Sequence, residues 1–162
     1  MNRLDELTRK DLLAALDNNT KAKAKKISGS RYVGITEDYT IHIDVNSVTA
    51  KPATKYRVKV KLLEYPDIEE EKDLDTREKV RLSLAGDMAI SCSCPAFRYW
   101  GYEYIVSQLD SIVGDEQKIF PKVRNPKLEG IMCKHCYHAM KYLGMQWSTI
   151  AKDIKNKNFL EE

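Results

Sequence analysis

The N-terminal part of the chain carries leucines at roughly helical spacing among charged residues. They are Leu4, Leu7, Leu12, Leu13 and Leu16. This pattern predicts an amphipathic helix that ends near Asn18-Asn19, because leucines three or four positions apart fall on one face of a helix. Such a helix usually packs against its own domain, and docking to a partner chain is the alternative.

Beyond Arg31 the period of the apolar positions changes to two, which is the period of a half-buried β-strand. Apolar and polar residues alternate over residues 39–45 and again over residues 55–62. Residues 46–54, which contain Pro52, are expected to form a turn between them. The pattern therefore predicts two neighbouring strands of an antiparallel meander, with His42 facing solvent.

Residues 64–79 are acidic and contain Pro66, so we expect a loop that includes one helical turn at most. Residues 80–85 and 88–92 flank Gly86-Asp87, a pair suited to a tight two-residue turn, and are predicted to form a β-hairpin. Helical spacing then returns twice, over residues 102–113 and in the segment that starts at Cys133.

Together these elements predict an α+β fold: a small antiparallel β-meander with an N-terminal helix and a ββα unit. We expect a helix and basic segment over residues 1–30, one domain over residues 31–145, and a tail over residues 146–162. The composition, 43% hydrophobic and 31% charged, is typical of globular proteins. No apolar run is long enough to cross a membrane and the chain starts without a secretory signal, so we expect a cytoplasmic protein.

Charge gives little indication of a partner, because the formal net charge is only +3. Basic residues nevertheless gather over residues 21–31 and on the polar face of the second predicted strand, and acidic residues gather over residues 67–75. The candidate phosphate contacts are Lys21, Lys23, Lys25, Lys26, Arg57, Lys59 and Lys61. A solvated surface is the ordinary explanation of such runs, and nucleic-acid binding is the alternative.

The candidate chemistry lies in four cysteines that occur in two short clusters. Residues 92–95 read Cys-Ser-Cys-Pro at the end of the predicted hairpin, and residues 133–136 read Cys-Lys-His-Cys at the start of the last predicted helix. In a reducing cytoplasm such cysteines are more often metal ligands than disulfides. Thiolates and imidazole are the donors that zinc selects. We therefore predict one structural zinc ion, bound by Cys92, Cys94, Cys133 and His135.

The fourth ligand has an alternative. Cys133-x-x-Cys136 is also a common zinc spacing and would give a site of four sulfurs. Cys136, however, falls on the apolar stripe of the last predicted helix, where a free cysteine packs as a small hydrophobic residue. We therefore favour His135 and keep Cys136 as the alternative ligand. His138 falls on the polar side of the same helix and is expected to be solvated or to support the site from outside.

These two clusters resemble the SWIM-type zinc finger, in which Cys-x-Cys is followed by a long spacer and by Cys-x-His at a helix start. In that family the first pair lies on a β-hairpin and the second pair opens a helix, which implies a ββα zinc-binding unit over about residues 80–145. The flanking residues match as well: residues 92–97 read Cys-Ser-Cys-Pro-Ala-Phe and residues 130–135 read Gly-Ile-Met-Cys-Lys-His. The departure is Cys136, where an aliphatic residue would be expected.

A narrower resemblance lies in the spacer between the clusters. An aromatic block, Phe-Arg-Tyr-Trp-Gly-Tyr at residues 97–102, and Arg124-Asn125-Pro126 before the second cluster are similar to small SWIM-like proteins of tailed bacteriophages. Those proteins are regarded as virion structural components, so the resemblance implies a subunit that binds other proteins in a large assembly. The aromatic block is expected to pack around the zinc site, with base stacking or partner docking as alternatives.

The sequence gives no support for catalysis. A catalytic zinc ion usually keeps one position open to water, whereas four good ligands would close this site. The chain contains no phosphate-binding loop, nucleophile elbow or paired-carboxylate motif. We therefore expect a non-enzymatic protein that acts through protein–protein contacts in a large assembly, in the cytoplasm or in a virion, with nucleic-acid binding as the alternative.

Overall fold

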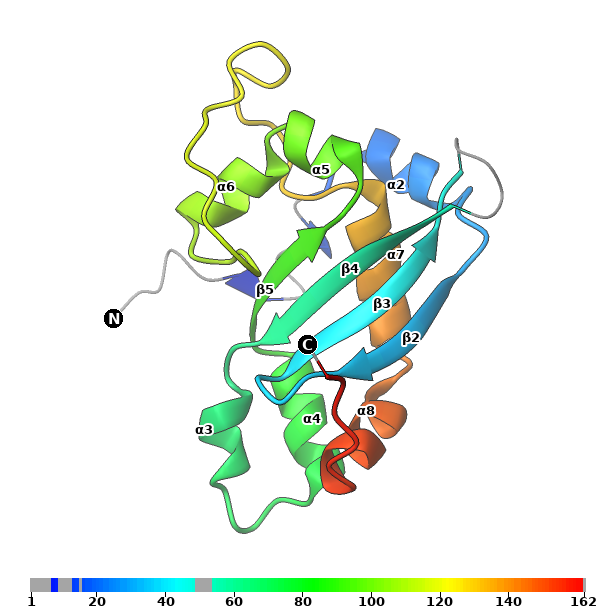
Figure 1. Ribbon diagram of the computed structural model, residues 1–162, viewed down its shortest axis with the longest axis vertical. Helices are drawn as coiled ribbons and strands as arrows, with labels where there is room; N and C mark the ends of the chain where they lie inside the picture. Colours follow the sequence, from blue (N-terminus) through cyan, green and yellow to red (C-terminus); the bar gives the residue numbers. More distant parts are fainter. Residues whose placement is uncertain (1–6, 9–12, 15, 49–53, 162) are drawn as a thin grey trace.

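The computed structural model describes residues 7–8, 13–14, 16–48 and 54–161. At its centre is a five-stranded sheet in the order β1-β5-β4-β3-β2, in which all neighbouring strands are antiparallel (Figure 1). The strands are β1 (Leu7–Thr8), β2 (Ser30–Ile35), β3 (Thr40–Asn46), β4 (Lys55–Leu62) and β5 (Asp87–Cys92). The helices are α2 (Asn18–Ala24), α3 (Tyr65–Glu69), α4 (Thr76–Leu84), α5 (Pro95–Tyr99), α6 (Tyr102–Gln108), α7 (Lys134–Leu143) and α8 (Trp147–Lys155). This combination confirms the predicted α+β class.

The two predicted strands of the meander are present as β3 and β4, and β2, which was not predicted, extends the meander on the other side of β3. Ile43 of β3 lies opposite Val58 of β4, and Ile41 lies opposite Val60. These four side chains are fully buried, while the residues between them are partly exposed. The alternation of apolar and polar residues therefore sets the register, because a slip of one residue would turn every apolar side chain towards solvent.

Helices cover one face of the sheet. Helix α7 packs against β2, β3, β4 and β5, and α8 packs against β2 and α4. Met140 and Leu143 of α7 are fully buried in the same core as the apolar side of the strands. The opposite face carries polar side chains, including His42, Asp44 and Arg57, which are partly exposed. The apolar stripe of α7 thus completes the core. Its burial stabilises the fold, because each Å² of apolar surface removed from water contributes about 25 cal/mol to the free energy of folding.

The predicted hairpin over residues 80–92 is wrong. Residues 80–84 belong to α4, and β5 pairs with β4 and β1 instead. Asp75 and Glu78 form a capping box: each side chain accepts the backbone N–H of the other residue, at 2.9 and 3.0 Å. This box starts a helix inside the expected loop, which also contains α3. Val80 and Leu84, one helical turn apart, then both face the core.

The predicted N-terminal helix also differs from the structure. Residues 7–8 form β1, the edge strand that pairs with β5, whereas residues 13–14 are helical. Leu4 and Leu12 lie outside the described residues. Helix α2 begins at Asn18, where the predicted helix was expected to end, because Asp17 caps it by accepting a backbone N–H at 2.7 Å.

The segment between the two cysteine clusters contains more turns than predicted. The aromatic block begins in α5, and α6 ends at Gln108 instead of near residue 113. Gly101 separates the two helices with a φ of 80°, and a Cβ atom there would lie 2.3 Å from Cγ of Pro121. Only glycine fits this position, because it tolerates the left-handed conformation and has no side chain to clash.

Residues 146–162, expected as a tail, contain α8, in which Ile150 is fully buried. The hydrophobic core therefore extends into this part of the chain. Within the described ranges, no helix is both long enough and apolar enough to span a membrane.

Candidate metal centre

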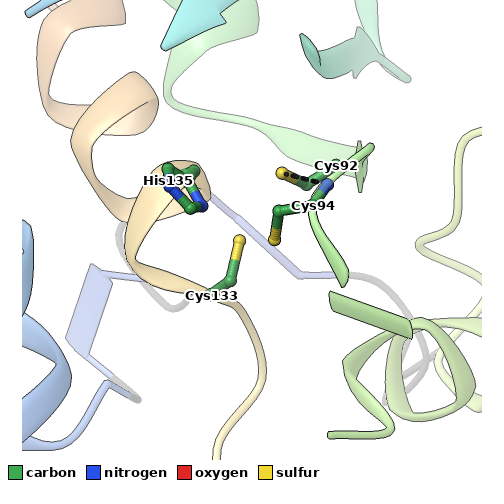
Figure 2. Close-up of side chains that lie close together, drawn as sticks. All are labelled: Cys92, Cys94, Cys133 and His135. Carbon is green, nitrogen blue, oxygen red and sulfur yellow. Dashed lines mark hydrogen bonds between the residues drawn. The ribbon is translucent and has the colours of Figure 1, made fainter. Parts of the chain in front are cut away.

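The two cysteine clusters meet where the end of one strand approaches the starts of two helices. Cys92 is the last residue of β5, and Cys94 is the N-terminal cap of α5. Cys133 is the N-terminal cap of α7, and His135 lies in its first turn. Figure 2 shows the first pair entering from the side of β5 and the second pair from the start of α7. The fold therefore brings together residues that are separated by a 38-residue spacer in the sequence.

The ligand atoms of these four residues form one tight group. One atom from each of Cys92, Cys94, Cys133 and His135 lies within 4.8 Å of the others. Cys94 and Cys133 are each 3% exposed and His135 is 4% exposed, while Cys92 is half-buried. All four cysteines of the chain are free thiols. The group could therefore hold a metal ion, as the spacing predicted.

The environment of His135 fits such an ion. Among the described residues, neither of its ring nitrogens has a hydrogen-bond partner, although both atoms are buried. Its ring packs against Tyr56 of β4, with ring centroids 4.8 Å apart. A buried polar atom without a partner costs about 1–3 kcal/mol. A metal ion bound through one nitrogen would remove that cost for the nitrogen and would use the neighbouring thiols as its other ligands.

Backbone groups support two of the sulfurs. The backbone N–H of Cys94 donates to Sγ of Cys92 at 3.5 Å, and the backbone N–H of Cys136 donates to Sγ of Cys133 at 3.5 Å. The second bond is an N-terminal cap of α7, so Cys133 also lies at the positive end of that helix dipole. Both features stabilise a thiolate, the form in which cysteine binds a metal.

Without a metal ion, the thiols of Cys92 and Cys94 hold their protons. The hydrogen bond with Cys133, together with burial, raises the pKa of Cys94 to about 12. For Cys92, the hydrogen bond with Cys133 lowers the pKa, but the bonds with Cys136 and Cys94 and burial outweigh it, so the pKa is raised. A bound cation would stabilise the charged forms of these thiols and displace their protons.

Cys136 lies beside the group but belongs to the core. It is fully buried and forms part of the same apolar cluster as Ala139 and Met140. Burial is the main cause of its raised pKa, and its thiol also interacts with those of Cys92 and Cys133. The set whose ligand atoms all lie within 4.8 Å contains His135 and omits Cys136. This geometry supports His135 as the fourth ligand.

The other two histidines have different partners. Nδ1 of His138 lies 2.6 Å from Oγ of Ser30, so His138 links α7 to β2. Burial, Lys141 and His135 all lower its pKa. His42 was expected to face solvent, but its Nδ1 lies 3.0 Å from the guanidinium group of Arg57 on the neighbouring strand.

The candidate phosphate contacts fall on separate surfaces. Lys21, Lys23, Lys25 and Lys26 lie on or directly after α2, which packs against α7. Arg57, Lys59 and Lys61 lie on the polar face of β4, opposite its buried residues. Two members of the β4 row already pair with carboxylates: Arg57 bonds to Asp44 at 2.6 Å, and Lys61 lies 3.5 Å from Asp38. The structure therefore does not combine the two groups into one basic surface.

A cleft of about 430 Å³ lies beside the metal-binding group and was not predicted. Cys133 and His135 form part of its wall, and Trp100, Lys23 and Asn125 line it as well. Asn125 is 7% exposed, and its amide donates to the carbonyl groups of Trp100 and Glu129, both at 2.9 Å. The Arg-Asn-Pro sequence was the only signal that singled out Asn125, and its contacts depend on how the spacer folds.

Comparisons with known proteins do not extend this picture. No family model matches the sequence, and no match is found among curated proteins or solved structures. Function is therefore inferred from the residues of this site and from the surfaces around it.

Proposed function

We propose that this chain is a non-catalytic structural protein that holds one zinc ion and acts through contacts with other protein chains in a large assembly. One observation carries the proposal: a buried group of three thiols and an imidazole whose ring nitrogens have no partner among the described residues. A single metal ion would satisfy these polar atoms together.

Zinc is the ion that this donor set suits best. Soft thiolates favour zinc or copper(I) over magnesium and calcium, which prefer oxygen ligands. Three thiolates and one imidazole also form one of the usual tetrahedral sets of structural zinc sites. In this role the ion supplies a cross-link: it joins the end of β5 to the start of α7, and so stabilises the long spacer between them.

Burial of the ligands favours a structural role over catalysis. Four protein ligands complete a tetrahedral zinc site, and no position is then left for water or a substrate. Cys94, Cys133 and His135 are each less than one-twentieth exposed. The cleft beside the site is lined by Cys133 and His135 but not by Cys92 or Cys94. A reaction at the ion would require one of these ligands to leave.

The surface near the site supports contacts with other proteins. Tyr99 and Trp100 are 65% and 46% exposed, and Ile119 and Val123 are 74% and 83% exposed. Large apolar side chains with this much exposure are candidates for contacts with other proteins. The resemblance to small SWIM-like virion proteins of tailed bacteriophages is our reason for proposing a virion as the assembly.

Nucleic-acid binding is the second candidate. Lys23, Lys25 and Lys26 are exposed on or directly after α2, and Lys23 lines the cleft together with Trp100, an aromatic ring on which a base could stack. The carboxylate partners of Arg57 and Lys61 count against the β4 row as a phosphate-binding surface. A net charge of +3 also gives only weak attraction to a polyanion.

The test compares the two candidates on the same protein. Mass spectrometry of purified native particles should find the chain in fixed stoichiometry with other subunits. The isolated zinc-loaded chain should show no tight binding to duplex or single-stranded DNA at physiological salt. Tight binding that weakens steeply with rising salt, together with absence from any particle, would favour the nucleic-acid function instead.

A further inference from the structure

A loop next to the metal centre presents apolar side chains to solvent. We call residues 118–127, between α6 and α7, the basic loop; exposed Asp115, Glu116 and Glu129 flank it. It projects from one end of the long axis of the molecule, above α5 and α6 in Figure 1. Ile119 is 74% exposed, Phe120 is 41% exposed and Val123 is 83% exposed. A soluble chain normally buries such residues, so their grouping on one loop indicates a contact surface.

The basic loop is held in place by hydrogen bonds. Asn125 is buried at its base and bonds to Trp100 and Glu129, while its backbone N–H donates to the carbonyl group of Pro121 at 3.0 Å. Phe120 contacts the ring of Tyr104 edge to face, with centroids 5.6 Å apart. The loop therefore presents its side chains in a fixed arrangement, which lowers the entropy cost of binding a partner.

The charge of the loop indicates what kind of partner it fits. Lys118, Lys122, Arg124 and Lys127 are all exposed, and residues 118–127 contain no acidic side chain. Within the described part of the chain, none of these four cations has an ion pair or a side-chain hydrogen bond. An acidic surface would supply the partners that they lack.

The chain itself carries such a surface at its opposite end. We call residues 67–75 the acidic segment; it runs from α3 to the start of α4 and contains six carboxylates and one lysine. Asp67, Glu70, Glu71 and Asp73 are exposed, and none of them forms an ion pair with another described residue. In Figure 1 the basic loop and the acidic segment lie at opposite ends of the long axis, so one molecule cannot join its own two surfaces.

We propose that the basic loop of one copy docks on the acidic segment of a second copy, so that the chains associate head to tail. This interface rests on the proposed function, an assembly subunit, and names its partner as another copy of the same chain. Contacts between two different surfaces of identical subunits generate a ring when the rotation closes and an open filament when it does not. The apolar groups of the loop are then covered, and the unpaired charges of both surfaces acquire partners.

Sedimentation velocity of the full zinc-loaded chain tests the association. We expect concentration-dependent oligomers at about 50 mM salt, and an association constant at least about tenfold lower at about 500 mM salt, where charges are screened within a few Å. A chain that remains monomeric at low salt and high concentration would overturn the proposal.

Charge reversal tests which surfaces meet. K122E/R124E, which alters the basic loop, and E70K/E71K, which alters the acidic segment, should each be monomeric alone. An equal mixture of the two variants should associate again, because each altered surface then meets a complementary one. K25E/K26E is the control: it makes the same change in charge as K122E/R124E, at two exposed lysines directly after α2. Its association constant should stay within about twofold of that of the wild type. If K25E/K26E lost association to the same extent as K122E/R124E, the loop would not be the specific contact.

Cross-linking distinguishes the proposal from its rivals. A carbodiimide joins lysines directly to carboxylates, so oligomers should contain links between residues 118–127 and residues 67–75. Links confined to other regions would overturn the interface. Binding of a monomeric chain to vesicles that contain anionic lipid, lost in K122E/R124E, would assign the loop to a membrane surface instead. If self-association fails while the chain is still found in native particles, this inference fails and the proposed assembly function stands.

Discussion

The ring of Tyr56 on β4 packs against the imidazole of His135 at the start of α7, with centroids 4.8 Å apart and ring planes inclined by 59°. Neither imidazole nitrogen has a hydrogen-bond partner among the described residues, so no hydrogen bond fixes the orientation of this ring. The contact with Tyr56 supplies that constraint. The sheet thus positions the fourth donor of the candidate metal centre, although the sheet itself contributes only Cys92 to the group.

Removal of the Tyr56 ring should therefore weaken metal binding. In Tyr56→Ala the imidazole of His135 gains rotational freedom, and we expect the affinity for zinc to fall about tenfold, at the lower end of effects seen for groups that orient ligands. Tyr56→Phe keeps the ring and should bind zinc as the wild type does. Competition with a chromophoric chelator measures the zinc affinity of the wild type and of both variants. Equal affinities for the three proteins would show that the ring contact does not orient His135.

Two substitutions distinguish the candidate fourth ligands. His135→Ala removes a ligand and should abolish stoichiometric zinc binding, whereas Cys136→Ala should retain the ion and lower the free energy of unfolding by about 1 kcal/mol through a small buried cavity. Metal content and chemical denaturation of each variant give the answer. Loss of zinc in Cys136→Ala with retention in His135→Ala would assign a four-sulfur site.

Removal of the metal should unfold one part of the chain selectively. Chelation, or Cys133→Ser, leaves β5 and α7 without the cross-link, so we expect hydrogen exchange to increase over residues 88–143. Neither β3 nor β4 contributes a ligand, so the pairing of β3 with β4 should remain protected for longer. Exchange should slow again when zinc is restored to the chelated protein. An unchanged exchange pattern would show that the ion has no structural role.

Zinc binding should release protons and weaken as the pH falls. The pKa of Cys94 is raised to about 12 in the metal-free site and that of Cys92 is raised as well, so both thiols are protonated at neutral pH. Zinc binds thiolates and must displace these protons, so its affinity should increase with pH up to the alkaline range and decrease on acidification. Calorimetry in buffers of different ionisation enthalpy measures the release. A zinc affinity that does not change with pH would contradict the prediction that the thiols of Cys92 and Cys94 lose protons when the ion binds.

The parts of the fold that follow from local periodicity could be predicted. Alternation identified β3 and β4, and the apolar stripe after Cys133 identified α7. The hairpin expected over residues 80–92 failed because Gly86-Asp87 also suits the end of a helix, and the capping box at Asp75 starts that helix. Residues 7–8 join the sheet as its edge strand through pairing with β5, and leucine spacing carries no information about such distant pairing.

The candidate metal-binding group could be predicted because two cysteines one residue apart, and a cysteine and a histidine one residue apart, already restrict the chemistry. The residues that support the site could not. Tyr56 contacts His135 only because α7 packs against β4 in the folded chain. Asn125 bonds to Trp100 only because the spacer brings residues 100 and 125 together. These contacts join residues far apart in the sequence, and single residues of these types carry no distinctive pattern.

Native mass spectrometry of the purified chain, before and after treatment with a chelator, tests the central claim most directly. The account predicts that the untreated protein carries one zinc ion per chain, and that chelation removes the ion and broadens the charge-state distribution as the region around the site unfolds. A chain that is purified without metal from zinc-supplemented cells, and that has the same compact distribution with and without chelator, would contradict it.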